Sequence, residues 1–516
     1  MRKKTLIALS LGLTLLAACG KDEINYIDAT QFDQIDNVSF DRTVTVTFSS
    51  SGVSVTGAPD DDFSYSVSGG GVTIVNDGGE AIRYELNGST GDGYFKVYSY
   101  TTMAIVLNSV SITNPSGAAI NVQGPSSKPS QGRRAYLVLN GSSTLADGTG
   151  YSTDSDEDEK GAVFAEGIIA ISGSGSLTVT ATGKSGIASD TYVHLISGTV
   201  TVNCSTGATV SNGDTLKPAA VKSQDSFIIS GGSLQANATG TGAKGLSGDG
   251  TAVFRGGTVN VTASGSNFGS KAAKEGPGGG PGGGGDSGSS DGVSAKGIKF
   301  DGAITVSGGT VKVSASSHEA MESKSSITIS GGEVYACSSS DDAINSAADF
   351  TITGGYVYAY APNNDGLDAN GDFYLNGGVV YAIGASSPEV AIDANTEESK
   401  QLYVNGGTLI ALGGLESGAE LNQSCYQASS WSTNTWYALK VGSTYYAFKT
   451  PASGGSGIVV SAASTPSLYS GGSTGSGDTY FDGLMVVGSG SYNGGSQVTL
   501  SSYSGGNSGG GNGPGH

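Results

Sequence analysis

Apolar and polar residues alternate in short runs along the middle of the chain, and glycine pairs interrupt these runs at regular intervals. The alternation has a period of two, as in a β-strand with one buried face. From residue 304 onward the pattern repeats as a unit, with glycine pairs at 308–309, 331–332, 354–355 and 377–378 that lie 23 residues apart. The pair at 406–407 follows after a six-residue insertion. Each unit therefore predicts a strand before the glycines, a strand after them and a third short strand.

Residues one unit apart form three apolar columns. They are Val311, Val334, Val357, Val380 and Leu409; Val313, Ala336, Ala359, Ala382 and Ala411; and Ile298, Met321, Ile344, Leu367 and Ile392. One unit cannot bury a core alone, whereas stacked units bury a continuous one. The sequence predicts an all-β fold, a right-handed parallel β-helix with coils of 23 residues and glycine at the corners, with an N-terminal β cap and a small C-terminal β region. A β-propeller needs longer units, and a β-sandwich has no repeat in register.

The N-terminus has the anatomy of a bacterial lipoprotein signal. Arg2, Lys3 and Lys4 precede an apolar run that is too short to span a bilayer, and the run ends in Leu-Ala-Ala-Cys at Cys19. Acylation of Cys19 would anchor the protein in a membrane, and we expect it at the outer membrane or cell surface. The expected organisation is a signal peptide (1–18), a lipidated tether (19–39), the β-helix (40–415) with a glycine-rich loop (274–292), a C-terminal β cap (416–504) and a disordered tail (505–516).

Composition narrows the partners. Glycine makes up 86 of 516 residues, which suits many tight turns, and the formal net charge of −20 argues against nucleic acid as a partner. Apart from Cys19 there are three widely spaced cysteines, which form no disulfide framework. We expect a monomer.

Acidic residues also recur with the repeat. Glu319, Asp342 and Asp365 form one row, and Glu322, Asn345 and Asp368 form a second, which Asp393 continues. Carboxylates about 4.8 Å apart repel one another unless a cation lies between them, and calcium prefers six to eight oxygen ligands. The predicted calcium ligands are Glu319, Glu322, Asp341, Asp342, Asn345, Asp365, Asp368 and Asp393. The alternative is a solvated acidic row. The three histidines are scattered in sequence and suggest no imidazole site.

Two further sets of residues each have two interpretations. The acidic loop at 154–159 either binds another ion or is simply solvated. An outward row of tyrosines either stacks against sugar rings or forms a ladder that stabilises the sheet. The predicted sugar-binding residues are Tyr335, Tyr356, Tyr358, Tyr360 and Tyr381, with Tyr374 and Tyr403 expected on the same face.

Several motifs in order resemble bacterial carbohydrate-binding β-helix proteins that bind cellulose and acidic sugars. They include TDSDEDEKGAVFAEG, AKGLSGD, SAKGIKFDG and NNDGLDANGD, each followed by a strand and a glycine turn. The resemblance implies a right-handed parallel β-helix with structural calcium, related to calcium-dependent polysaccharide lyases but without lyase activity. In such lyases a lysine beside calcium acts as the base, and Lys296 and Lys299 occupy a comparable place next to Glu319 and Glu322. The simpler interpretation is that these lysines neutralise the acidic rows.

The expected function is calcium-dependent binding of a cellulose-like or acidic polysaccharide by a non-catalytic, lipid-anchored protein of the cell envelope. The alternatives are a pectate-lyase-like enzyme that uses Lys296 or Lys299, and a structural adhesin.

Overall fold

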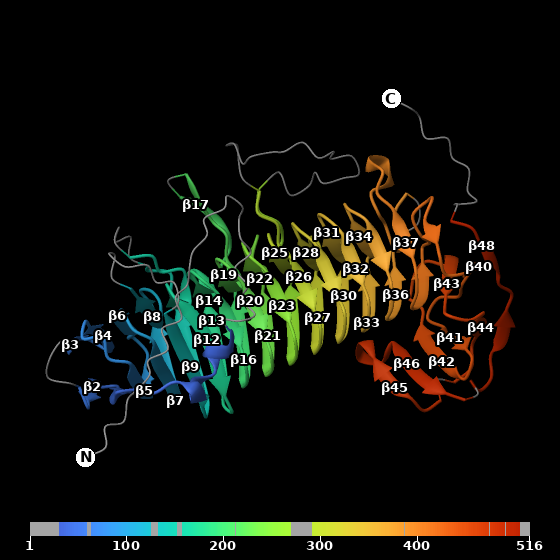
Figure 1. Cartoon of the computed structure of the whole chain (residues 1–516). Coiled ribbons are helices and arrows are strands. Elements are labelled where there is room, and N and C mark those ends of the chain that lie inside the picture. Colours follow the sequence, from blue (N-terminus) through green and yellow to red (C-terminus); the bar gives the residue numbers. More distant parts are fainter. Residues whose placement is uncertain are drawn as a thin grey trace, which may run out of the picture.

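The computed structural model describes residues 30–58, 63–124, 133–151, 157–211, 213–269, 292–385, 388–473, 475–490 and 492–505. The predicted signal peptide, the Cys19 lipidation site, nearly all of the glycine-rich loop and the tail from residue 506 lie outside these residues. The described part is all β, with long parallel sheets that are consistent with a β-helix (Figure 1). No helix in this part has the length and apolar character needed to cross a bilayer.

Most strands belong to three parallel ladders, which we call ladders 1, 2 and 3. Ladder 1 contains β1 (Arg42–Ser49), β5 (Ile82–Thr90), β7 (Met103–Asn114), β9 (Arg134–Asn140), β12 (Ile168–Gly173), β15 (Val193–Leu195), β20 (Phe227–Ile229), β23 (Ala252–Phe254), β26 (Ile304–Val306), β29 (Ile327–Ile329), β32 (Phe350–Ile352), β35 (Phe373–Leu375), β37 (Leu402–Val404) and β39 (Glu420–Leu421). Ladder 2 starts at the end of β7 and contains β10 (Ser142–Asp147), β13 (Ser176–Ala181), β16 (Thr199–Cys204), β21 (Ser233–Ala238), β24 (Thr258–Ala263), β27 (Thr310–Ala315), β30 (Glu333–Ser338), β33 (Tyr356–Tyr360), β36 (Val379–Ile383) and β38 (Thr408–Leu412). Ladder 3 contains β4 (Gly71–Asn76), β6 (Phe95–Ser99), β8 (Ile120–Gln123), β11 (Gly161–Ala165), β14 (Ser185–Ser189), β19 (Ala219–Ser223), β22 (Lys244–Gly248), β25 (Ile298–Phe300), β28 (Met321–Ser323), β31 (Ile344–Ser346) and β34 (Leu367–Ala369).

The strand register confirms the predicted apolar columns. Val334 pairs with Val311 on one side and Val357 on the other, and Ala336 continues the second column in the same way. Met321 pairs with Ile298 and Ile344, so the third column follows ladder 3. All members of the three columns are buried in one continuous core.

The glycine pairs form the corner between ladders 1 and 2. The second glycine of each pair has a positive φ, +76° at Gly332, which other residues adopt at a cost. A Cβ atom at Gly332 would also lie 2.6 Å from the carbonyl oxygen of Gly309 in the preceding coil. Backbone conformation and close stacking therefore both require glycine here.

The N-terminal segment packs on the outer surface of ladder 1. It contains two 3-10 turns, η1 (Thr30–Asp33) and η2 (Ile35–Asn37). Asp33 is fully buried, where it accepts a hydrogen bond from Tyr192 and contacts Arg134 and the Nδ1 atom of His194. The prediction that residues 19–39 form a tether is therefore wrong for the described part of that range, because a buried ion-pair network holds it against ladder 1.

The remaining strands lie at the two ends and in one excursion. At the N-terminal end, β2 (Gly52–Thr56) and β3 (Phe63–Ser68) form antiparallel hairpins with β1 and β4. In the excursion between β16 and β19, β17 (Thr209–Ser211) pairs with β18 (Asp214–Leu216). A short turn, η4 (Thr396–Glu398), lies between Ile392 and β37 in the coil that carries the insertion.

A small β region follows the last coil, and we call it the cap. It contains β40 (Cys425–Ser430), β41 (Trp436–Val441), β42 (Thr444–Lys449), β43 (Ser456–Ser461), β44 (Ser467–Ser470), β45 (Asp478–Tyr480), η5 (Phe481–Gly483), β46 (Met485–Ser489), β47 (Ser496–Val498) and β48 (Ser501–Tyr503). Strand β43 pairs antiparallel with β38, so the cap extends the sheet and closes its edge. The six-stranded sheet of the cap then folds back beside the last strands of ladder 2 (Figure 1).

Candidate functional site

Ladder 3 brings the predicted calcium ligands together. Glu322, Asn345 and Asp368 occupy equivalent positions in β28, β31 and β34, and Lys299 precedes them in β25. Glu319, Asp342 and Asp365 lie in the turns just before these strands, and all three are buried. The 23-residue period therefore places two rows of oxygen-bearing side chains next to each other.

Hydrogen bonds connect the two rows at the later coils. The Asn345 amide donates to Asp342 Oδ2 (3.2 Å) and to Asp368 Oδ2 (2.5 Å). The backbone N–H of Asp365 donates to Asp342 Oδ1 (3.1 Å), and that of Val390 donates to Asp365 Oδ1 (2.6 Å). These contacts hold several carboxylates within reach of a single cation.

The carboxyl groups at this end lack a positive partner in the described structure, and their pKa values reflect it. Burial, followed by the charges of neighbouring carboxylates, holds the pKa of Asp342 well above its usual range. Burial raises the pKa of Asp365 to about 8 and that of Asp368 to about 7. Burial and a hydrogen bond with Glu416 raise the pKa of Asp393 to about 10. A divalent cation would relieve this repulsion and keep the group ionised.

The earlier end of the rows is neutralised by lysine. The buried Lys296 ammonium lies 3.0 Å from Glu319 and 2.6 Å from Glu322, and Lys324 also contacts Glu322. Burial alone would raise the pKa of Glu322, but the two lysines lower it to about 2. Glu319 and Glu322 thus have ion-pair partners, whereas Asp342, Asp365, Asp368 and Asp393 are the donor set that fits a cation best.

His318, a residue that was not among the predicted ligands, adjoins this site. His318 Nδ1 contacts Glu319 and lies 2.7 Å from Asp341 Oδ2, and these three groups are close enough to share one ion. Burial lowers the pKa of His318, but the hydrogen bonds to Asp341 and Glu319 raise it to about 9, so the imidazole is cationic at neutral pH. The signal was available, because Asp341 follows His318 by one 23-residue period.

Lys296 and Lys299, the two lysines considered as a catalytic base, both form ion pairs. Burial would lower the pKa of Lys296, but Glu319 and Glu322 raise it, which stabilises the ammonium form. Lys299 pairs with Asp301. Lys244, in register with Lys296 one coil earlier, is buried, and burial with the charges of Lys296 and Lys299 lowers its pKa to about 7. Among the described residues Lys244 has no ion-pair partner.

The acidic loop is only partly described. Residues 152–156 lie outside the described residues. Glu157 and Glu159 contact Lys96, and Asp158 lies 2.8 Å from Lys160. The described part of the loop is therefore matched by lysines, and its role as an ion site stays open.

The tyrosine row is largely covered by the cap. Tyr335, Tyr358 and Tyr381 are in register in ladder 2, and Tyr335 stacks on Tyr358 with ring centroids 4.9 Å apart. The prediction that this row lies open to glycan is wrong for Tyr358 and Tyr381, which are 6% and 0% exposed. They pack against Phe481 and Phe448 of the cap, and the Tyr381 hydroxyl donates to the carbonyl oxygen of Lys449 (2.9 Å).

The other tyrosines differ in position. Tyr356 stacks on Tyr480 of the cap at 3.6 Å, whereas Tyr335 and Tyr360 stay partly exposed at the edge of the cap. Tyr374 and Tyr403 lie in ladder 1 and not on the ladder 2 face, which corrects the prediction that they flank the same row. They form a separate, partly exposed stacked pair with centroids 5.0 Å apart.

Comparisons with known proteins identify a family. Residues 68–343 match the family model described as "Carbohydrate-binding domain-containing protein". Among solved structures, the chain is similar to a polysaccharide lyase-like protein from C. thermocellum, determined as a gadolinium derivative, with 16% identity and a TM-score of 0.29 over 73% of this chain and 98% of that one. No curated protein matches the chain. The family match includes the first residues of the acidic rows and Tyr335, and it ends before Tyr360 and the cap.

Proposed function

Because the chain belongs to the family of carbohydrate-binding domain-containing proteins, we propose that it is a calcium-dependent, non-catalytic polysaccharide-binding protein of the cell envelope. The family match over residues 68–343 is the observation that carries this proposal. The acidic polysaccharides and cellulose-like glucans expected from the sequence motifs are the proposed ligands. The coils are proposed to wind with a right hand, the hand that parallel crossovers favour.

Calcium is proposed at the later end of the acidic rows. Hydrogen bonds hold the oxygen atoms of four side chains together there, those of Asp342, Asn345, Asp365 and Asp368. The raised pKa values of the three aspartates indicate that their ionised forms need a nearby positive charge, which a bound cation would supply. Calcium accepts this mixture of carboxylate and amide oxygens in a flexible geometry, whereas magnesium demands a tighter octahedron. The ion would stabilise the coils and offer a positive charge beside them.

The location in the cell envelope rests on the lipobox at Cys19, which lies outside the described residues. Acylation at this cysteine would hold the β-helix at a membrane surface while the ladders remain accessible to polysaccharide. A cysteine-to-serine change at position 19 should release the protein from the membrane fraction.

A glycan array, probed with and without a calcium chelator, tests the proposed function. We expect binding to a limited set of glucans or uronate-rich polysaccharides, and we expect chelation to weaken it. An array without any glycan signal would favour the structural adhesin. Release of unsaturated uronide, followed by ultraviolet absorbance, would establish the lyase alternative, for which Lys244 offers a lysine with a pKa of about 7.

A further inference from the structure

The cap and ladder 2 enclose a cleft, and most of its lining residues lie outside the matched family segment. A groove of about 420 Å³ is lined by Tyr335, Tyr360 and Lys449, among other residues of β30, β33 and the cap. A narrower cavity of about 80 Å³ continues from it, and both share Tyr360 and Pro451. The groove has the size typical of small-molecule sites.

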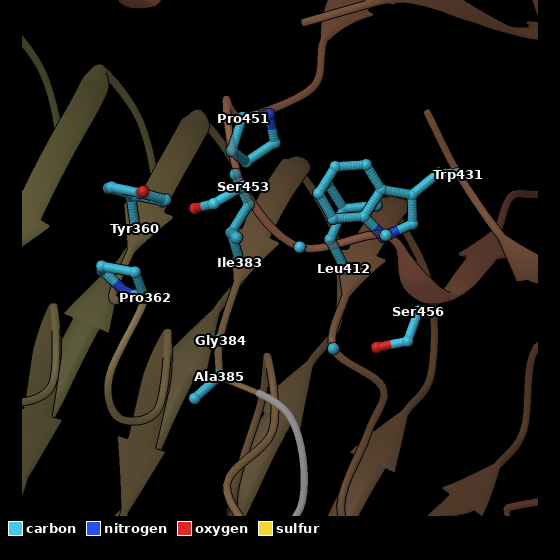
Figure 2. Close-up of a pocket in the computed structure, with 13 residues that line it drawn as sticks. Tyr360, Pro362, Ile383, Gly384, Ala385, Leu412, Trp431, Pro451, Ser453 and Ser456 are labelled. Atoms are coloured by element: carbon cyan, nitrogen blue, oxygen red, sulfur yellow. The ribbon is translucent and has the colours of Figure 1, made fainter. Parts of the chain in front are cut away.

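Two aromatic side chains form the walls of the narrower cavity. Figure 2 shows Tyr360 and Trp431 on opposite sides, with Ile383 and Leu412 between them. Tyr360 comes from ladder 2, and Trp431 follows β40 of the cap. Aromatic walls around a small apolar floor suit a ring that has apolar faces and a polar rim, as a pyranose has.

The indole of Trp431 supplies an unmet hydrogen bond. Trp431 is 8% exposed, and its Nε1 atom is buried without a hydrogen-bond partner. Buried polar groups are nearly always paired, so an unpaired donor in a cavity wall indicates a ligand acceptor. The backbone at Gly454 packs tightly against the indole ring, because a Cβ atom there would lie 2.8 Å from the Trp431 ring.

The groove next to this cavity carries a positive charge. Lys449 lines the groove, and no carboxylate forms an ion pair with it among the described residues. The other lysine near Tyr335, Lys312, lies over the ring at 5.1 Å but pairs with Asp482. In a protein with a net charge of −20, a lysine without such a partner in an aromatic groove favours an anionic ligand.

We propose that this cleft is the glycan-binding site: one pyranose ring lies between Tyr360 and Trp431, and the next sugar lies in the groove with its carboxylate at Lys449. The inference rests on the proposed polysaccharide-binding function and deepens it by naming the site and a uronate-containing chain as the ligand. The hydroxyl groups of the first ring would satisfy the indole N–H, and the second ring would pack near Tyr335.

The test uses the two tryptophans of the protein, Trp431 and Trp436, as reporters. In the full-length Trp436→Phe variant, Trp431 alone contributes tryptophan emission. We expect oligogalacturonate to change this emission along the same curve that calorimetry gives for binding. Tyr360→Ala should weaken binding about tenfold or more, as loss of a stacking ring does. Trp431→Phe keeps an aromatic ring, so a folded protein with weaker binding would identify the role of the N–H.

Two control variants test whether the loss of binding is specific to this cleft and whether the charge of Lys449 selects the ligand. Tyr374→Ala alters another partly exposed stacked tyrosine, in ladder 1, and should leave affinity unchanged. Lys449→Met should weaken oligogalacturonate binding but not the weaker binding of a cello-oligosaccharide. Equal affinity of the native protein for both sugars would overturn the carboxylate assignment.

Glycan binding that leaves Trp431 emission and the Tyr360→Ala affinity unchanged would overturn the cleft and leave the proposed function standing. Absence of binding to either sugar, and to any glycan of the array, would overturn both.

Discussion

Lys244 has the least favourable electrostatic surroundings of the lysines near the acidic rows. It is buried, it faces Lys296 one coil later, and Lys299 and Lys217 add further positive charge, with Glu322 as the opposing group. Its pKa in the folded protein is about 7, below the ordinary value of 10.5. The folded state therefore binds fewer protons than the unfolded state between these two values, and the stability contributed by this group rises with pH across that window.

We expect Lys244→Met to stabilise the protein most below about pH 7 and progressively less toward pH 10.5. Methionine keeps the apolar length of the side chain without its charge. Melting curves of both proteins at a series of pH values measure this difference. A melting-temperature difference that is the same at both ends of the window would show that the Lys244 ammonium is not destabilised in the folded protein.

The acidic residues show how much of the candidate site can be predicted from sequence spacing. The rows were predictable because a fixed coil length converts a sequence offset into a contact, and the same rule places Asp341 beside His318. The spacing also predicted that Lys296 and Lys299 neutralise the rows, and Lys296 does pair with Glu319 and Glu322 of the next coil. The spacing could not predict that Lys299 pairs instead with Asp301, because that choice depends on side-chain conformation.

Single coils depend on their glycine corners. Gly332→Ala would place a methyl group 2.6 Å from the Gly309 carbonyl oxygen and force a positive φ on alanine. Backbone strain of this kind costs about 1–3 kcal/mol, and the steric overlap adds to it. We expect a clear loss of stability in denaturant or thermal unfolding.

Gly69→Ala is the matched control for this corner. Gly69 also has a positive φ, but a Cβ atom there would meet no atom within 4 Å. The control should therefore reveal the conformational cost alone, and the difference between the two variants measures coil stacking. Equal destabilisation by both substitutions would mean that the coils separate easily at the corner.

The contact between the cap and ladder 2 is the part of the fold that the repeat pattern could not predict. The sequence pattern of an outward tyrosine row is the same whether solvent, sugar or another element of the protein covers the row. Phe481 reaches Tyr358 from far along the chain, and its positive φ of 56° arises in a turn with no repeat. The local sequence pattern predicts the row of tyrosines in ladder 2, whereas its coverage by the cap depends on packing between distant parts of the chain.

We expect Tyr381→Ala to destabilise the protein by about 3–5 kcal/mol, as other large-to-small aromatic substitutions in cores do. Tyr381 of β36 is fully buried and packs against Phe448, and its hydroxyl donates a hydrogen bond to the Lys449 carbonyl oxygen. Tyr374→Ala, in the partly exposed pair of ladder 1, should cost much less. A Tyr381→Ala protein as stable as the Tyr374→Ala protein would show that the cap does not pack on this row.

At the scale of the whole molecule, the coils form one stack with a continuous core, so a stabilising contact at one point supports its neighbours. The acidic rows lie along this stack. With no cation, the raised pKa values of Asp365 (about 8) and Asp368 (about 7) mean that the folded state binds protons which the unfolded state releases near pH 4. The stability of the calcium-free protein should therefore fall as pH rises from about 4 to 8.

Calcium should reverse this trend, because it binds the ionised carboxylates of the folded form alone. A free calcium concentration of a hundred times the dissociation constant adds about 2.7 kcal/mol to the free energy of unfolding. Calcium should therefore raise the melting temperature at neutral pH and progressively less in acid, where the carboxylates are protonated. Magnesium should replace calcium poorly.

Asp342→Asn together with Asp365→Asn should remove most of the calcium response. It should also flatten the fall in stability of the calcium-free protein, because two mutually repelling carboxylates are gone while the apolar columns behind them are intact. Asp349→Asn, in a turn near ladder 1, is the control that should keep the response. Superimposable melting curves with calcium and with chelator at neutral pH would return these rows to ordinary acidic side chains that bind no ion.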